Sequence, residues 1–171
     1  ASPAKAIRFF RKIAPEQHML LAERLARMYG DTGQFTRSNQ MYRNLIKAKK
    51  RSYRVVSYQR AITENIQSMG NQVKAVTEVK RLVSLWRKVK GAKDAKPKRV
   101  ARDKKGIELL LRTLATTYHR QASKTRSDQD YGVAYALYTD YMKTFPDGRD
   151  AYDMGYYFAE LLMTLQKWGN A

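Results

Sequence analysis

Residues 25–45 read LARMYGDTGQFTRSNQMYRNL and carry the clearest structural signal in this chain. Leu25, Ala26 and Tyr29 recur at the spacing that places side chains on one face of an α-helix. Gly33 follows, and glycine tolerates the positive φ that a tight turn between helices needs. A second helical face comes after the turn: Phe35, Ser38, Tyr42 and Leu45. The stretch therefore predicts a helical hairpin in which small residues lie where the two helices cross.

The same spacing recurs along the chain. Further copies begin at Ile62, Leu114 and Phe158, at separations of 37, 52 and 44 residues. This pattern resembles the tetratricopeptide repeat (TPR) family, whose repeat is a helix–turn–helix of 34 residues, so each copy carries an insertion. The resemblance covers most of residues 15–171. The segment 138–146, with Tyr138, Tyr141, Phe145 and Pro146, is similar to repeats of bacterial cell-envelope proteins, which favours a periplasmic location.

The resemblance implies an all-α fold, a right-handed α-solenoid of TPR-like helical hairpins with insertions between repeats. Residues 1–171 would form a single helical domain that is a fragment of a longer protein. Its expected parts are a flanking helix at 3–13, repeat 1 at 15–50, a degenerate repeat 2 at 53–89, a basic linker at 90–106, repeat 3 at 107–146 and a partial repeat 4 at 150–171.

The charge of the chain is strongly positive and unevenly distributed. The net charge is +19, and residues 131–171 are slightly acidic, so residues 1–130 carry all of the excess. A field of this size attracts polyanions such as nucleic acid or an anionic surface, although a solvated surface without an anionic partner is an equal alternative. The densest basic segment comprises Arg87, Lys88, Lys90, Lys93, Lys96, Lys98, Arg99, Arg102, Lys104 and Lys105.

Catalytic and metal-binding motifs are missing from the sequence. The chain has no Cys and only two His, His18 and His119, which are far apart. It contains no HExxH motif, no glycine-rich phosphate loop and no carboxylate cluster with metal-ligand spacing. We therefore expect no enzymatic activity, no metal and no cofactor.

The TPR resemblance also implies a binding groove lined by the first helix of each repeat. Transferred position by position, the groove would contain Glu23, Arg27, Arg60, Glu64, Arg112, Thr116, His119, Tyr156 and Glu160. Arg27, Arg60 and Arg112 could contribute to a clamp for a terminal carboxylate, but the Lys and Asn residues of such clamps are missing.

Two functions follow as hypotheses. The first is a non-enzymatic scaffold that binds a peptide or helix of a protein partner in the groove. The alternative is a helical-repeat protein that binds nucleic acid or an anionic surface through its basic half. We also expect the C-terminal edge to be covered by self-association, by a crystal contact or by the missing segment of the parent protein. There Trp168 and one apolar face of residues 151–167 would lack a covering helix: Met154, Phe158, Leu161, Leu162 and Leu165.

Overall fold

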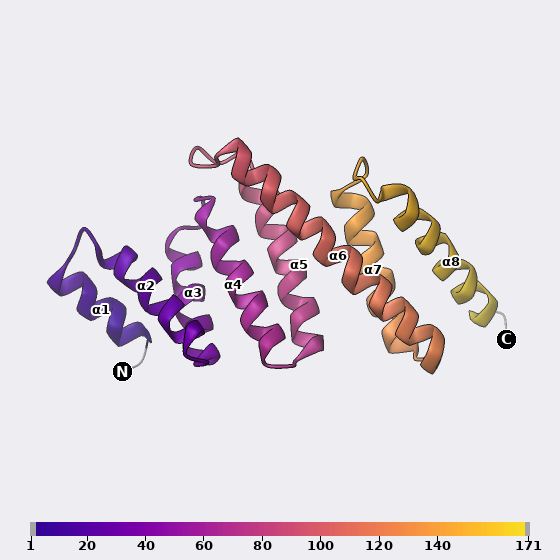
Figure 1. Cartoon of the computed structure of the whole chain (residues 1–171), viewed down its shortest axis with the longest axis horizontal. Helices are drawn as coiled ribbons and strands as arrows, with labels where there is room; N and C mark the ends of the chain where they lie inside the picture. The colour runs from indigo at the N-terminus through magenta and orange to yellow at the C-terminus, as the bar shows by residue number, and fades with distance from the viewer. Residues whose placement is uncertain (1–2, 170–171) are drawn as a thin grey trace. The chain divides into compact units, whose positions relative to one another are not determined.

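The computed structural model describes residues 3–169, with side chains described through residue 165. This part of the chain is all α-helical, as the sequence predicted, and contains eight helices (Figure 1). They are α1 (Pro3–Ile13), α2 (His18–Asp31), α3 (Phe35–Ala48), α4 (Arg54–Ser68), α5 (Gln72–Val89), α6 (Pro97–Thr125), α7 (Asp128–Thr144) and α8 (Ala151–Gly169). Among these described helices, none is both long and apolar enough to cross a membrane.

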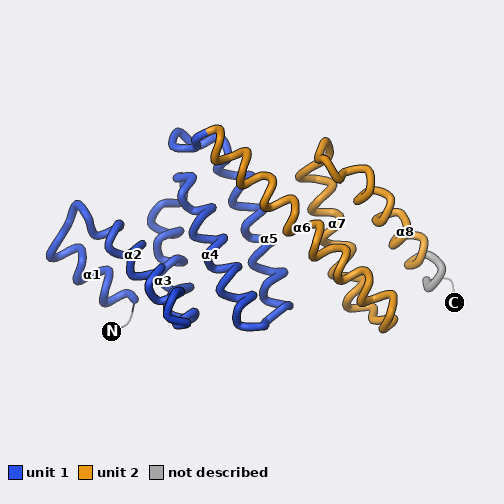
Figure 2. Tube along the Cα trace, viewed as in Figure 1, with its two compact units in different colours: residues 1–96 blue, residues 97–171 orange. Residues whose placement is uncertain are grey.

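The chain divides into two compact units, whereas the sequence predicted a single domain. Unit 1 comprises residues 1–96 and unit 2 residues 97–171 (Figure 2). Unit 1 contains α1 to α5, and each of these helices packs on the next one in sequence. Unit 2 contains α6, α7 and α8, in which α7 packs on both of the other helices.

The hairpin predicted from residues 25–45 is present as α2 and α3. α2 ends at Asp31, Gly33 adopts a φ of +74°, and α3 begins at Phe35. Ala26 and Ser38 are completely buried where the helices cross, and Ser38 Oγ donates a 2.8 Å hydrogen bond to the carbonyl oxygen of Ala26. The two helices approach closely because a small side chain from each occupies the crossing.

The second hairpin, predicted as degenerate, consists of two continuous helices, α4 and α5. Gly70 adopts a φ of +72° in the turn. Asn71 then caps α5, because its side-chain oxygen accepts a 2.9 Å hydrogen bond from the backbone N–H of Lys74. Asn65 of α4 donates hydrogen bonds to Ser38 and Asn39 of α3. A buried polar contact therefore joins the second hairpin to the first.

The prediction of a basic linker at residues 90–106 was wrong in its second half. α6 already begins at Pro97, so only residues 90–96 connect α5 to α6. Proline is favoured at the first helical position, where its missing N–H is not needed. Asp103 lies buried on the second turn of α6, with Arg99 and Arg102 at 3.9 Å and 3.7 Å from its carboxylate. These contacts allow a highly charged segment to continue as helix.

The connection at residues 90–96 is held against the rest of unit 1 by Asp94. One carboxylate oxygen of Asp94 accepts a 2.8 Å hydrogen bond from the backbone N–H of Tyr53, and the other accepts one from the Ser52 hydroxyl. The hydrogen bond from Ser52 and that from Tyr53 lower the pKa of Asp94. An acidic residue within the basic segment therefore fixes this loop against the turn between α3 and α4.

The prediction of an uncovered face on the last helix was only partly right: Leu162 is 37% exposed, but other residues of that face are buried. Met154 and Leu161 are completely buried, because α8 packs on α7 and α6 through them. A different face of α8 is exposed and carries Tyr152, Tyr156 and Met163, which are 87%, 64% and 59% exposed. The Trp168 side chain lies outside the described residues, and self-association at this edge stays a prediction.

Candidate functional site

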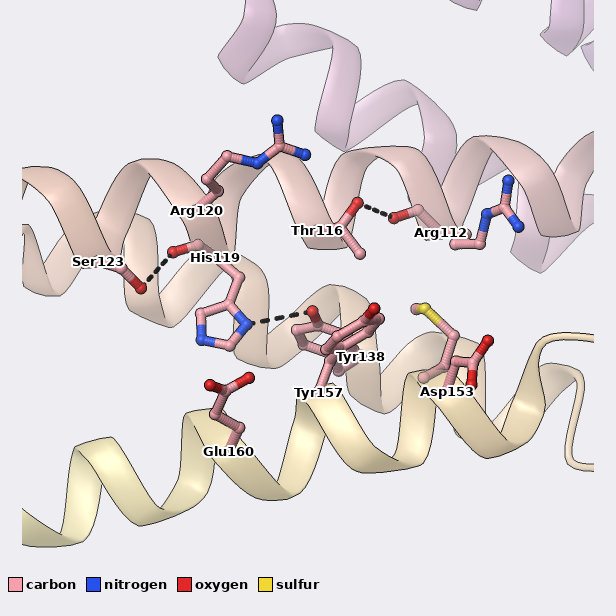
Figure 3. Close-up of a pocket in the computed structure, with 10 residues that line it drawn as sticks. Arg112, Thr116, His119, Arg120, Ser123, Tyr138, Asp153, Tyr157 and Glu160 are labelled. Carbon is pink, nitrogen blue, oxygen red and sulfur yellow. Dashed lines mark hydrogen bonds between the residues drawn. The ribbon is translucent and has the colours of Figure 1, made fainter.

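A pocket of about 510 Å³ lies within unit 2, between α6 and α8, with a residue of α7 at its base (Figure 3). The α6 wall supplies a polar stripe, and the α8 wall supplies two carboxylates and a tyrosine. The lining residues are Arg112, Thr116, His119, Arg120, Ser123, Tyr138, Asp153, Met154, Tyr157 and Glu160.

Helical periodicity explains why these side chains share the pocket. On α6 the lining residues run from Arg112 to Ser123 at steps of three and four, which keeps them on one face. At a rise of 1.5 Å per residue this stripe is roughly 16 Å long. On α8, Asp153, Tyr157 and Glu160 follow the same rule. The site is therefore a short groove between two helical walls.

The two walls carry opposite charges, and several of these charges have no ion pair. Arg112 forms a salt bridge with Asp150, just before α8, in which its guanidinium lies 2.7 Å from a carboxylate oxygen. Arg120 on the α6 wall forms no ion pair with any described residue, and neither do Asp153 and Glu160 on the α8 wall. Counting only partners among the described residues, the groove therefore has a cation without an ion pair on one side and two such carboxylates on the other.

The base of the groove is formed by a buried aromatic contact. His119 is 9% exposed, and its Nδ1 lies 3.2 Å from the Tyr138 hydroxyl. The rings meet edge to face with their centroids 5.8 Å apart, and the Phe158 ring stacks on Tyr138 at a centroid distance of 5.6 Å. Figure 3 shows the Glu160 carboxylate facing the His119 ring.

Burial determines the protonation of these two groups. It lowers the pKa of His119, and the nearby charge of Glu160 opposes this shift without cancelling it. Burial, reinforced by the charge of Glu160, raises the pKa of Tyr138. At neutral pH the imidazole is thus neutral and the phenol protonated, so the pair forms a neutral hydrogen bond.

The groove contains four of the nine residues that the TPR resemblance implied, namely Arg112, Thr116, His119 and Glu160. Tyr156 was also expected in the groove, but it is 64% exposed and does not line this pocket. Its neighbour Tyr157 does. Sequence reasoning missed Arg120, Ser123, Tyr138, Asp153, Met154 and Tyr157. Extending the α6 stripe by one turn would have found Ser123, but Tyr138 and Met154 have the spacing of core residues.

The implied groove residues of unit 1 are Glu23, Arg27, Arg60 and Glu64. Glu23 is engaged internally, because it accepts hydrogen bonds from Arg54 and from the Tyr58 hydroxyl. The charges of Arg27 and Glu64 both act on the Tyr42 hydroxyl, whose pKa is raised mainly by burial. Arg60 of α4 is partly buried. α2 and α4 thus place several of the implied residues near Tyr42, but Glu23 already has partners within the chain.

The residues of the basic segment are divided between the two units. Arg87 and Lys88 lie near the end of α5, and Lys90 places its ammonium 5.3 Å from the Trp86 ring. Lys93 and Lys96 belong to the connection. The remaining five lie on the first turns of α6: Lys98, Arg99, Arg102, Lys104 and Lys105.

The described residues contain no group of three or more His, Asp or Glu side chains that could hold a metal ion. Compared with known proteins, the chain matches no protein-family model and no curated protein.

Proposed function

We propose that this protein is a non-catalytic scaffold that binds a peptide segment of a protein partner in the groove between α6 and α8. The observation that carries the proposal is the pair of facing walls, with Arg120 on one side and Asp153 and Glu160 on the other. None of the three forms an ion pair with a described residue. Charged groups of both signs on opposite walls suit a ligand that itself presents donors and acceptors on both edges.

An extended peptide has this property. Its backbone presents N–H and C=O groups on both edges, and its side chains alternate between its two faces. At roughly 3.3 Å per residue, a groove of about 16 Å holds about five residues. Tyr157, which is 41% exposed, supplies apolar surface for a side chain, while Arg120 and Glu160 favour a peptide with an acidic and a basic residue.

The fold is consistent with this role. We propose that the helical hairpins are TPR-like repeats of a right-handed α-solenoid, because consecutive helices pack as pairs and small residues occupy the crossing of α2 and α3. In such proteins each repeat covers the apolar face of the neighbouring repeat. Surfaces of stacked helices are then available for binding extended ligands.

The test begins with selection of a phage-displayed heptapeptide library on the whole chain. The enriched peptides are then titrated by fluorescence anisotropy against the Arg120→Glu and Glu160→Arg variants. Lys124→Glu and Asp147→Arg are matched controls, because both residues are exposed in unit 2 and lie outside the groove. We expect each groove variant to weaken binding at least tenfold, and each control less than twofold. Peptides that bind all variants equally would contradict the groove assignment.

The alternative is a binder of nucleic acid or an anionic surface. It is favoured by Lys98, Arg102 and Lys105, which are exposed at steps of four and three along one face of α6. Neutralising duplex phosphates gives a slope of roughly −0.9 per contact in log affinity against log salt. A 20-base-pair duplex titrated at two salt concentrations therefore tests it. Tight and steeply salt-dependent binding would support this alternative over the peptide scaffold.

A further inference from the structure

Unit 1 contains a second pocket of about 440 Å³, between α3 and α5 and next to the C-terminal end of α4. Three cations and one carboxylate gather there, together with hydroxyl and amide groups. The pocket is lined by Thr36, Asn39, Gln40, Arg43, Ile66, Met69, Lys74, Thr77, Glu78 and Arg81. None of these residues belongs to the α6–α8 groove or to the basic segment.

The buried side chain of Glu78 binds both arginines of the pocket. It is 4% exposed, and its Oε1 accepts hydrogen bonds of 2.7 Å from both Arg43 and Arg81. Its Oε2 accepts a third, also of 2.7 Å, from Gln59. Burial raises the pKa of Glu78, but the hydrogen bonds from Arg43 and Gln59 and the charges of both arginines outweigh burial and lower it. The carboxylate is thus ionised and holds two guanidinium groups at one oxygen.

Both arginines retain donors for another ligand. A guanidinium has five N–H groups, and among the described residues the side chain of each arginine forms its hydrogen bond and ion pair with Glu78 alone. The side chains of Arg43 and Arg81 are 39% and 52% exposed, so the remaining donors are accessible. Lys74 lies one turn before Glu78 on α5 and forms no ion pair with any described residue. Three cations against one carboxylate leave a net charge of +2.

We propose that this pocket binds a phosphate monoester. A phosphate monoester is close to a dianion at neutral pH, which matches the net charge of +2. Its three terminal oxygens can accept bonds from several separate donors, and it carries about twice the negative charge of a carboxylate. α3 and α5 also contribute residues near their N-termini, Thr36 and Lys74, where the helix dipole favours an anion. The ligand is either free phosphate or a phosphorylated side chain, and the proposal does not depend on the α6–α8 groove.

The experiment titrates the whole chain, by isothermal titration calorimetry, with capped phosphoserine, inorganic phosphate, capped glutamate and dimethyl phosphate. Lys74→Gln and Arg81→Gln remove one cation each from the pocket, and Lys88→Gln is the matched control. Lys88 is exposed on the same helix but lies outside the pocket. Lys74 is exposed and takes no part in the Glu78 cluster, so Lys74→Gln tests the site without disturbing the fold.

We expect capped phosphoserine to bind at least tenfold more tightly than capped glutamate and dimethyl phosphate. Lys74→Gln and Arg81→Gln should each weaken that binding about tenfold, and Lys88→Gln less than twofold. Inorganic phosphate that binds as tightly as phosphoserine would identify a free-anion site, and weaker binding would identify a phosphorylated side chain; both support the proposal. Equal losses in Lys74→Gln and Lys88→Gln, equal affinity for the monoanions, or no binding of phosphoserine would overturn it.

Discussion

The Ser38 hydroxyl donates a hydrogen bond of 2.8 Å to the carbonyl oxygen of Ala26, and both residues are completely buried. The same hydroxyl accepts a 2.9 Å bond from the Asn65 side chain. Ser38 therefore connects α3 to α2 and to α4 within unit 1. The single hydroxyl group of Ser38 thus forms hydrogen bonds with both neighbouring helices.

Replacing Ser38 with alanine should destabilise the protein. The change leaves one donor of Asn65 without its partner in a buried site, which costs about 1–3 kcal/mol. Urea unfolding followed by circular dichroism measures the loss. Ser84→Ala is the control, since Ser84 is exposed on α5, and it should change the unfolding free energy by less than about 0.5 kcal/mol. Equal stability of the two variants would show that the Ser38 bond contributes nothing.

The two turn glycines should each resist substitution because of their backbone conformation. Gly33 and Gly70 have φ values of +74° and +72°, and an added Cβ would meet no atom within 4 Å at either position. The cost of alanine is therefore conformational, about 1–2 kcal/mol per site. Gly91→Ala is the control, because Gly91 is equally open and does not share the positive φ. Thermal unfolding should separate the two classes; a Gly33→Ala variant as stable as Gly91→Ala would be a contrary result.

The Gly33 turn belongs to the part of the fold that the sequence predicted well. Gly33 between two helical faces, with Ala26 and Ser38 at the crossing, specified the hairpin because glycine and small residues have few other uses at those positions. The start of α6 was predicted less well, since its first turns contain many basic residues and no apolar stripe. What supports them is Asp103, whose burial between Arg99 and Arg102 depends on the folded structure.

The groove was predicted in part for a similar reason. Arg112, Thr116 and His119 were implied by the TPR resemblance, and they lie on one face of α6 along the groove. Tyr156 and Tyr157 are neighbours, and either one fits a helical spacing to Glu160. Only the packing of α8 on α6 and α7 determines that Tyr157 lines the groove.

Glu78 should make the stability of unit 1 sensitive to acid. Its pKa is lowered in the folded protein, so the folded state favours the ionised form. That stabilisation is complete above the unfolded pKa of 4.5 and is lost as pH falls through the lower, folded value. Glu78→Gln should remove this part of the pH dependence and also destabilise the protein at pH 7, because the new amide places N–H donors against arginine or Gln59. Urea unfolding at pH 7 and pH 4 measures both effects, with exposed Glu64→Gln as control.

Because of His119, the stability of the protein should fall as the pH is lowered. A histidine that is stabilised in its charged form would have the opposite effect. Burial lowers its pKa below the unfolded value of 6.5, so the unfolded state binds the proton more readily. Stability is therefore complete above pH 6.5 and is lost as pH falls from 6.5 towards the folded pKa. His119→Gln should flatten the decline in Tm between pH 7 and pH 5. Proton NMR titration of the imidazole gives the pKa directly. Glu160→Gln should lower it further, because the carboxylate facing His119 favours the protonated form. A His119 resonance that titrates at or above 6.5 would refute the assignment of a neutral imidazole at the base of the groove.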